Sequence, residues 1–471
     1  MATDNRRDLL TTERTDPPQD PSVEQEQPPG VLRKAIAASA VGNATEWFDY
    51  GLYAYGVTYI SVAIFPGDGA TATLLALMTF AVSFLVRPLG GFVWGPLGDR
   101  LGRRQVLAIT ILLMAGATFC VGLVPSYDSI GLWAPVLMVI LRMIQGFSTG
   151  GEYGGAATFM AEYAPSRRRG LLGSFLEFGT LAGFSLGALM MLGVSLMLSD
   201  DQMNTWGWRV PFLIAAPLGL IGLYLRSRLD DTPIFRELQE SDREEKSIWT
   251  EFKDLLVEYR GQILRLGGLV VALNVVNYTL LSYMPTYLQT SIGLSTDTAL
   301  VVPIIGMLSM MVFLPFAGLL SDRFGRKPMW WISLGGLLAL VVPMFMLMST
   351  SVPGAIIGFA VLGLLYVPQL ATISATFPAM FPTHVRYAGF AIAYNVSTSL
   401  FGGTAPAAND WLIQQTGNNL MPAFYMMAAC LVGMLALVKL PETARCPIGG
   451  TEIPGTEDAP PPVEYDLVGN R

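Results

Sequence analysis

The sequence contains few charged residues and almost none of the side chains that build metal centres or disulfide frameworks. Asp, Glu, Lys and Arg make up 14% of its 471 residues, against roughly 25% in soluble globular domains. A single His and three Cys without paired spacing predict no metal site and no disulfide framework. Neither G-x-x-x-x-G-K-[ST] nor G-x-G-x-x-G occurs, so we expect no nucleotide or other cofactor and no ATP-driven activity by this chain alone.

The sequence is rich in long hydrophobic stretches. Hydrophobic residues make up 52% of the chain, and the mean hydropathy is +0.48. Because about 20 apolar residues cross a bilayer, the hydropathy pattern predicts an all-α membrane protein with twelve transmembrane helices. The predicted spans lie near 35–62, 73–97, 105–125, 131–162, 171–198, 208–226, 263–288, 298–320, 328–348, 353–378, 388–413 and 420–440.

The distribution of Lys and Arg supports this count and predicts an orientation. Of the 29 Lys and Arg, 26 lie in alternate loops or in the two terminal segments. Positive residues stay on the cytoplasmic side of short loops. We therefore expect a multi-pass protein of a bacterial cytoplasmic membrane with both termini in the cytoplasm. Only Arg87, Arg142 and Arg209 fall within or at the edge of the membrane.

The chain also repeats itself. The segment Gly95–Arg104 recurs as Gly318–Lys327 at an offset of 223 residues, and a looser echo links Pro165–Arg169 with Pro382–Arg386. Such a repeat predicts two pseudo-symmetric six-helix bundles that rock about a site near the midplane. The predicted parts are a disordered cytoplasmic tail at 1–34, a six-helix bundle at 35–226, a cytoplasmic central loop at 227–262, a second six-helix bundle at 263–440 and a disordered cytoplasmic tail at 441–471.

The repeated segment has the pattern G-x-L-x-D-R-x-G-R-[RK]. Its glycines permit a tight turn, and its Asp can cap a helix N-terminus or pair with a neighbouring Arg. The pattern resembles the signature loop of the major facilitator superfamily, which implies the two-bundle fold of that superfamily. We expect these residues to form a conformational latch and not a substrate site: Asp99, Arg103, Asp322 and Arg326.

The first span carries two carboxylates on a polar face. Asn43, Glu46, Tyr50 and Tyr53 share one side of the helix, with Asp49 at its edge. Charged groups within a membrane face the bundle interior and pair with cations. The candidate partners are Arg87 in the second span and Arg142 in the fourth. A static charge pair that fixes helix packing is the alternative to a transport role.

Glu152 and Glu177 add two carboxylates to the N-terminal half, whereas no ionisable residue is expected deep in the C-terminal spans. A carboxylate near a movable Arg in an apolar interior can exchange protons under working conditions. Arg142-x-x-Gln145-Gly146 also resembles a superfamily signature that is associated with proton transfer. The predicted proton-coupling residues are Glu46, Asp49, Arg142 and Glu152.

Aromatic residues accompany these charges. Rings around a cavity hold quaternary ammonium groups by cation–π attraction, and several rings lie beside the carboxylates of the first span. The predicted substrate-binding residues are Asn43, Trp47, Tyr50, Tyr53, Arg87 and Tyr278. In the fifth span Gly179, Gly183 and Gly187 recur at four-residue spacing, which predicts close helix packing.

Several longer segments resemble the metabolite:proton symporter family of the superfamily. They are Gly42–Asp49, Arg87–Gly91, Gln145–Tyr153, Trp206–Phe212 and Phe377–Tyr387. Two further segments, Val124–Pro135 and Met284–Tyr287, are similar in particular to members that import the osmoprotectants proline and glycine betaine. The resemblance implies proton symport of a zwitterion that carries a carboxylate and a secondary or quaternary amine. It also implies a pathway lined by the polar face of the first span.

Three alternatives remain open from the sequence. A di- or tricarboxylate such as 2-oxoglutarate or citrate would need more than one cationic site, and the bidentate fork of Arg142 suits such acids. A non-transporting sensor would need a signalling domain, which we do not recognise. An enzyme would need a nucleophile–base or metal constellation, which we do not find, so we predict no enzymatic activity. The expected partners are a small-molecule substrate, protons and the lipid bilayer, without nucleic acid.

Overall fold

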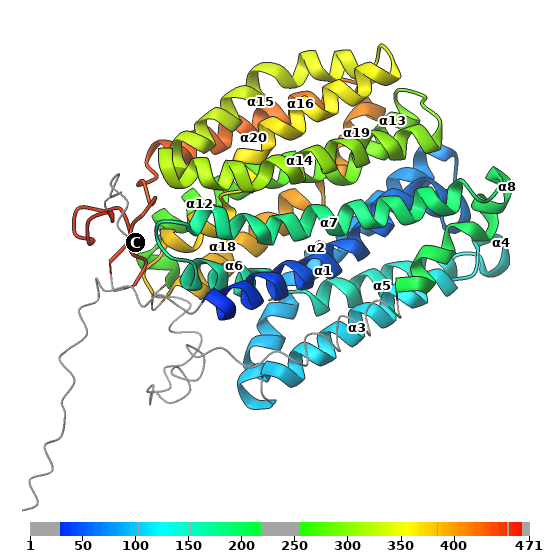
Figure 1. Cartoon of the computed structure of the whole chain (residues 1–471). Coiled ribbons are helices and arrows are strands. Elements are labelled where there is room, and N and C mark those ends of the chain that lie inside the picture. The colour runs from blue at the N-terminus through cyan, green and yellow to red at the C-terminus, as the bar shows by residue number, and fades with distance from the viewer. Residues whose placement is uncertain are drawn as a thin grey trace, which may run out of the picture.

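The computed structural model describes residues 29–101, 103–150, 152–215, 217, 255–383, 385–449 and 452–463. Within these ranges every regular element is a helix, and the long helices run side by side in one elongated bundle (Figure 1). Most of the predicted central loop, most of the predicted N-terminal tail, His384 and the chain after Val463 lie outside the described residues. The side chains of Asp99, Arg103 and Glu152 also lie outside the described part of the chain.

The first half of the chain forms five long helices and a shorter one within the described residues, joined by short turns. Residues 209–215 and 217 are also helical. The elements are α1 (Pro29–Ile64), α2 (Gly69–Leu101), α3 (Arg103–Leu123), α4 (Tyr127–Ile130), α5 (Trp133–Ser148), α6 (Glu152–Tyr163), α7 (Arg169–Ser195), α8 (Asp200–Gln202) and the π-helical turn η1 (Met203–Gly207).

The second half begins at Arg260 and contains two π-helical turns within longer helical stretches, η2 and η4. The elements are α12 (Arg260–Asn277), η2 (Tyr278–Tyr283), α13 (Met284–Thr290), α14 (Thr296–Phe324), α15 (Arg326–Met348), α16 (Val352–Leu370), α17 (Ile373–Thr376), η3 (Pro378–Met380), α18 (Arg386–Ser397), η4 (Thr398–Gly402), α19 (Ala405–Thr416) and α20 (Met421–Val438).

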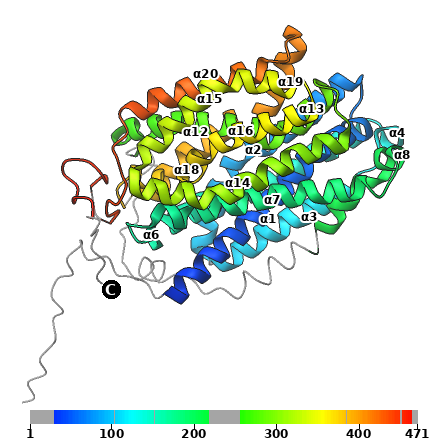
Figure 2. The same cartoon turned by 45° about the horizontal axis from the view of Figure 1, so that its top comes forward.

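The two halves lie against each other lengthwise, with α7 beside α14 in both views (Figures 1 and 2). One end of the molecule carries Asp322 and Arg326, and α7 begins and α14 ends there. We call it the motif end. The opposite end carries α4 and α8 and is called the far end (Figure 1). The two halves differ in the side chains that they bury. The charged face predicted for α1 is buried in the first half.

Seven helical stretches of the described residues are long and apolar enough to cross a membrane. They are Gly69–Trp94, Arg169–Ser195, Arg260–Thr290, Thr296–Phe324, Arg326–Met348, Val352–Thr376 and Met421–Val438. Helix α1, with 36 residues, is long enough as well but carries polar side chains on its inward face.

The predicted fourth span, 131–162, is not one helix. Helix α5 ends at Ser148, and α6 begins at Glu152. The hydroxyl groups of Ser148 and Thr149 both donate to the carbonyl of Gln145, at 2.9 and 3.4 Å. Such back-bonding bends helices, and Gly150 follows without a side chain to resist the bend. The break lets Tyr153 of α6 stack against the second half of the chain.

Helices α2 and α5 touch through their backbones. A Cβ atom at Gly146 would lie 1.7 Å from the carbonyl oxygen of Ser83, and one at Gly150 would lie 2.0 Å from that of Arg87. No side chain fits in these spaces, so glycine at both positions sets the distance between the two helices. This contact fixes how the helix of Arg87 lies against the helix of Arg142.

The replacement Gly146→Ala is expected to destabilise the protein by at least about 1–3 kcal/mol, because the added methyl group forces α5 away from α2. Thermal unfolding in detergent and the yield of monodisperse protein would measure the loss. Gly116→Ala in α3 is the matched control, since a Cβ atom there meets nothing within 4 Å. Equal unfolding temperatures for the two variants would contradict the backbone contact.

The glycine stripe predicted to allow close packing in the fifth span does so, against α1. A Cβ atom at Gly179 would lie 2.2 Å from the carbonyl oxygen of Ala40, and one at Gly183 would lie 2.4 Å from that of Ala44. The prediction is confirmed: α1 and α7 pack backbone to backbone, and this contact holds the charged face of α1 in place.

The chain after α20 differs from the disordered tail that we expected at 441–471. Residues 441–449, which we call the C-terminal segment, pack across the motif end, and Cys446 and Ile448 are buried. Arg169 donates to the carbonyl of Cys446 at 2.9 Å, and Arg386 donates to that of Ile448. The segment is therefore held by one arginine from each half. The composition of the segment does not indicate this order, because the order comes from contacts with residues far away in the sequence.

Candidate functional site

The candidate site is built around a buried ion pair between α1 and α2. Arg87 Nη2 donates to Glu46 Oε1 at 2.6 Å, and the two residues are 2% and 4% exposed. The structure thus pairs Glu46 with Arg87, one of the two partners expected. Removing one member of such a pair would leave the other charge uncompensated in an apolar interior.

Arg142 of α5 lies close by but has a different set of contacts. Its Nη1 donates to Gln145 Oε1 at 2.7 Å, and its guanidinium carbon lies 4.2 Å from the centre of the Tyr53 ring. Asp49 is buried beside Thr118, within the electrostatic reach of Arg142. Gln145 Nε2 donates to Thr118 Oγ1 at 2.7 Å. Arg142 and Asp49 are therefore linked through Gln145 and Thr118.

Four aromatic rings from both halves of the chain pack together beside Arg87. Tyr50 neighbours Trp47 and Phe84, with ring centres 5.7 and 4.8 Å apart. Tyr278 of η2 completes the circle, at 6.0 Å from Trp47 and 5.1 Å from Phe84. The guanidinium carbon of Arg87 lies 5.7 Å from the centre of the Tyr50 ring and 5.4 Å from that of Phe84. We call Trp47, Tyr50, Phe84 and Tyr278 the aromatic ring.

Three polar atoms in this region have no hydrogen-bond partner among the described residues. They are the hydroxyl group of Tyr278 and the Nε atoms of Arg87 and Arg142, all buried. A buried donor without a partner costs about 1–3 kcal/mol. Such atoms are suited to contact a ligand that brings its own acceptors.

Asn43 and Tyr53, two further predicted binding residues, are engaged in helix packing in this conformation. Asn43 Nδ2 donates to the carbonyl of Leu176 at 2.8 Å and to Thr180 Oγ1 at 2.6 Å, both in α7. The Tyr53 hydroxyl donates to the carbonyl of Ala76 at 3.0 Å. Tyr50, by contrast, bonds Thr149 at the break after α5, at 3.1 Å.

Two features of the site were missed from the sequence. Phe84 belongs to the aromatic ring but gives no signal, because Phe is ordinary in an apolar span. Asp410 of α19 is buried, although no ionisable residue was expected deep in the second half. It accepts hydrogen bonds from Tyr283 at 3.3 Å and Gln414 at 2.6 Å. Its position near the end of the predicted span 388–413 was the available signal.

The predicted latch residues Asp322 and Arg326 meet the first half at the motif end. The two carboxylate oxygens of Asp322 accept from the backbone N–H groups of Gly170 and Leu171, at 2.8 and 2.9 Å. Arg326 Nη2 donates to the same carboxylate at 2.6 Å. A carboxylate at a helix N-terminus is stabilised by the helix dipole. Asp322 therefore caps α7 and joins the halves.

The far end is closed by other contacts between the halves. The Tyr55 hydroxyl donates to the carbonyl of Leu281 at 2.9 Å, and Gln414 Nε2 donates to that of Ala70, near the start of α2, at 3.1 Å. Contacts thus seal both ends, and the Glu46–Arg87 pair is enclosed between them.

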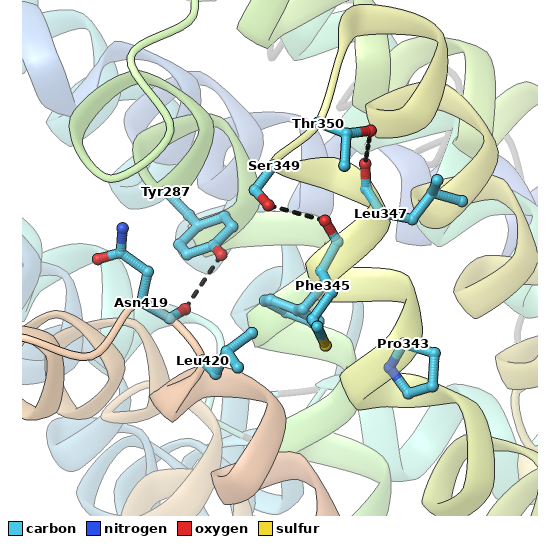
Figure 3. Close-up of a pocket in the computed structure, with 9 residues that line it drawn as sticks. Tyr287, Pro343, Phe345, Leu347, Ser349, Thr350, Asn419 and Leu420 are labelled. Carbon is cyan, nitrogen blue, oxygen red and sulfur yellow. Dashed lines mark hydrogen bonds between the residues drawn. The ribbon is translucent and has the colours of Figure 1, made fainter.

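A cavity of about 570 Å³ lies elsewhere, at the far end of the second half (Figure 3). It includes none of the predicted site residues, and the Tyr287 hydroxyl at its wall donates to the carbonyl of Asn419 at 3.0 Å. No group of three or more His, Cys, Asp or Glu side chains in the described ranges is placed to hold a metal ion. The cavity is lined by Tyr287, Pro343, Phe345, Met346, Leu347, Ser349, Thr350, Asn419 and Leu420.

Known proteins share this fold. The xylose transporter of Escherichia coli, in a partially occluded inward-open conformation, superimposes with a TM-score of 0.69 at 20% sequence identity. The alignment covers 88% of this chain and 99% of that one. At this identity the match concerns the fold alone.

Curated relatives are more similar in sequence. A proline/betaine transporter of Escherichia coli K12 is 45% identical over 429 residues, covering 89% of this chain and 86% of the relative. A glycine betaine/proline/ectoine/pipecolic acid transporter of Dickeya dadantii is 44% identical, covering 89% and 85%. An ectoine/proline transporter of Corynebacterium glutamicum is 41% identical, covering 90% and 87%. The sequence profile of the Major Facilitator Superfamily matches residues 47–407.

The repeated latch motif, the two packed halves and these matches agree with one another. The chain is a multi-pass membrane protein with the all-α fold expected from its sequence. It belongs to the Major Facilitator Superfamily and, within it, to the family of these proline/betaine transporters.

Proposed function

We propose that this chain is a secondary transporter that imports a small zwitterionic osmoprotectant, such as proline or glycine betaine, together with protons by alternating access. The observation that carries the proposal is the buried Glu46–Arg87 pair within the aromatic ring. The compounds in the names of the three relatives all combine a carboxylate with a positively charged nitrogen centre. Arg87 suits the carboxylate of such a compound, and the faces of the aromatic rings suit its positively charged nitrogen.

Competition for Arg87 gives the mechanism. While Glu46 is ionised, it is paired with the guanidinium group of Arg87 and keeps the substrate carboxylate away from it. A proton on Glu46 removes that charge, and the carboxylate of the substrate takes its place on Arg87, whose Nε is still without a partner. The ammonium group then lies against the aromatic ring, with the Tyr278 hydroxyl as a further donor. Asp49, Arg142 and Glu152 are proposed as additional members of the proton-coupling set.

Alternating access requires the two predicted bundles, 35–226 and 263–440, to move against each other. The contacts of Asp322 at the motif end and of Tyr55 at the far end would then break in turn. The Lys and Arg bias of the loops supports an orientation with the motif end, and with it both termini, in the cytoplasm.

Uptake of a di- or tricarboxylate is less well supported. Such a substrate needs a second cation at the site, whereas both Nη atoms of Arg142 are already bonded, to Gln145 and Ser83, and its guanidinium group faces Tyr53. The curated relatives named above transport zwitterions.

The proposal is tested with the purified protein in proteoliposomes, exposed in turn to glycine betaine, proline, citrate and 2-oxoglutarate. We expect alkalinisation outside the vesicles with glycine betaine or proline, because protons would enter with the substrate. A response to citrate or 2-oxoglutarate alone would refute the proposal that the substrate is a zwitterion. Accumulation of proline without proton movement would refute the coupling.

A further inference from the structure

Glu177 of α7 is a buried carboxylate to which the proposed cycle has assigned nothing so far. It lies two turns beyond the start of α7, between the motif-end latch at Gly170 and the contact of Asn43 with α7. Its Oε1 accepts from the Tyr153 hydroxyl at 2.5 Å, and its Oε2 accepts from Thr180 Oγ1 at 2.9 Å. Both donors are neutral groups.

No cation pairs with Glu177 within the described part of the chain, a property it shares with Asp410, whose donors Tyr283 and Gln414 are also neutral. Glu46 is paired with Arg87, Asp322 with Arg326 and Glu162 with Arg386. An ionised carboxylate without a cation is costly in an apolar interior, and it takes up a proton instead. Glu177 is thus placed to hold a proton while the molecule is closed.

The groups that face Glu177 come from several elements. Helix α1 presents Asn43, α6 presents Tyr153, α16 presents Tyr366, and α18 presents Tyr394. The charge of α14 nearest to the start of α7 is Asp322, which is bonded to backbone N–H groups and Arg326. From α17, Ser374 contacts Gly173.

The surroundings of Glu177 cross the boundary between the two halves. The ring of Tyr153 stacks on that of Tyr394, with centres 4.6 Å apart and planes 16° from parallel. Tyr153 is therefore bonded to Glu177 and covered by the second half. Any opening at the motif end separates Tyr153 from Tyr394 and admits water to the carboxyl group.

Glu177 is also connected to the aromatic ring. Thr180 Oγ1, which donates to Glu177, accepts from Asn43 Nδ2 at 2.6 Å. Asn43 Oδ1 in turn accepts from Trp47 Nε1 at 3.1 Å. Thr180, Asn43 and Trp47 thus link the carboxyl group to a face of the proposed substrate site.

We propose that Glu177 is a second proton-carrying carboxylate of the transport cycle, which releases its proton to cytoplasmic water when the Tyr153–Tyr394 contact opens. The proton leaves the carboxyl group as hydronium, the carboxylate remains bonded to Tyr153 and Thr180, and a proton must return before the halves close again. This inference rests on the proposed proton symport. It adds a site for proton release that is separate from the Glu46–Arg87 pair.

The test compares two kinds of flux in proteoliposomes that hold the full chain. Exchange of labelled proline across the membrane needs no empty carrier, whereas net uptake driven by a pH gradient needs the carrier to return without its proton. Glu177→Gln mimics the protonated state permanently. We expect exchange at the wild-type rate, and net uptake lowered by at least about tenfold.

Glu258→Gln is the matched control, because this carboxylate is exposed before α12 and should change neither flux. Net uptake by Glu177→Gln at the wild-type rate and pH profile would overturn the inference, and so would loss of exchange in a folded variant. If Glu177→Gln does not fold, Tyr153→Phe decides: a shifted pH profile of net uptake supports the inference, and an unchanged profile overturns it. Net uptake of proline without proton movement in the wild type would instead refute the proposed function.

Discussion

Replacing Arg87 with Gln is expected to lower the free energy of unfolding by about 3–5 kcal/mol and to abolish substrate binding. The buried carboxylate of Glu46 would lose the guanidinium group that donates to it at 2.6 Å, and an uncompensated buried charge carries a cost of this size. The substrate carboxylate would lose its proposed partner as well. Thermal unfolding and equilibrium binding of proline to the purified protein would measure the two effects.

Glu46→Gln is expected to destabilise the protein much less than Arg87→Gln does, and to affect transport in a different way. The Gln side chain keeps an acceptor for Arg87, whose guanidinium group also faces the rings of Tyr50 and Phe84. Downhill flux of proline should persist, whereas accumulation driven by a pH gradient should be lost, because the group that couples protons to substrate can no longer titrate.

The double variant Glu46→Gln/Arg87→Gln separates stability from function. It buries no charge at the pair, so its stability should return close to that of the wild type, while binding stays lost. If the double variant binds proline, Arg87 is not the substrate partner and the ion pair only fixes helix packing. That outcome would favour the static alternative that the sequence left open.

The sequence predicts best where one local pattern decides the result. The helical spacing of Glu46 and Tyr50 identified the inward face of α1, and the small size of the glycine stripe in α7 predicted close helix packing. The repeated motif placed Asp322 and Arg326 at a junction, since an Asp beside glycines suits a helix N-terminus. These features need no knowledge of distant contacts.

Other features depend on contacts between residues far apart in the chain. The pairing of Glu46 with Arg87 depends on how α2 lies against α1, which no charge pattern reveals. The break between α5 and α6 arises from hydroxyl groups that also occur within intact helices. Composition likewise described the C-terminal segment as a tail, because its order comes from Arg169 and Arg386.

The second large effect is expected from removing that C-terminal segment. Arg169 and Arg386 stand 217 residues apart, as do their other backbone acceptors, the carbonyl groups of Ala161 and Pro378. Both halves thus hold the C-terminal segment with the same local arrangement. Arg169 of the first half binds it at Cys446, and Arg386 of the second half binds it at Ile448. The segment ties the two repeats together where they must separate.

Glu442 adds a third attachment. Its carboxylate accepts from the backbone N–H groups of Arg326 and Lys327, at 2.8 and 3.0 Å, and so caps the start of α15. Hydrogen bonds to charged groups contribute about 1.5–3 kcal/mol each. A truncation after Leu440 removes the two arginine contacts and the cap. We therefore expect the closed motif end to lose at least about 3 kcal/mol.

Hydrogen exchange at the start of α7 would measure this loss directly. The N–H groups of Gly170 and Leu171 are bonded to Asp322 only while the motif end is closed, so the truncation after Leu440 should accelerate their exchange. A truncation after Val463 keeps the segment and serves as the matched control. Equal exchange in both truncated proteins would mean that Asp322 alone holds the halves together. Faster exchange in the shorter one alone would show that closure of the motif end depends on the segment, because both truncations leave the latch residues in place.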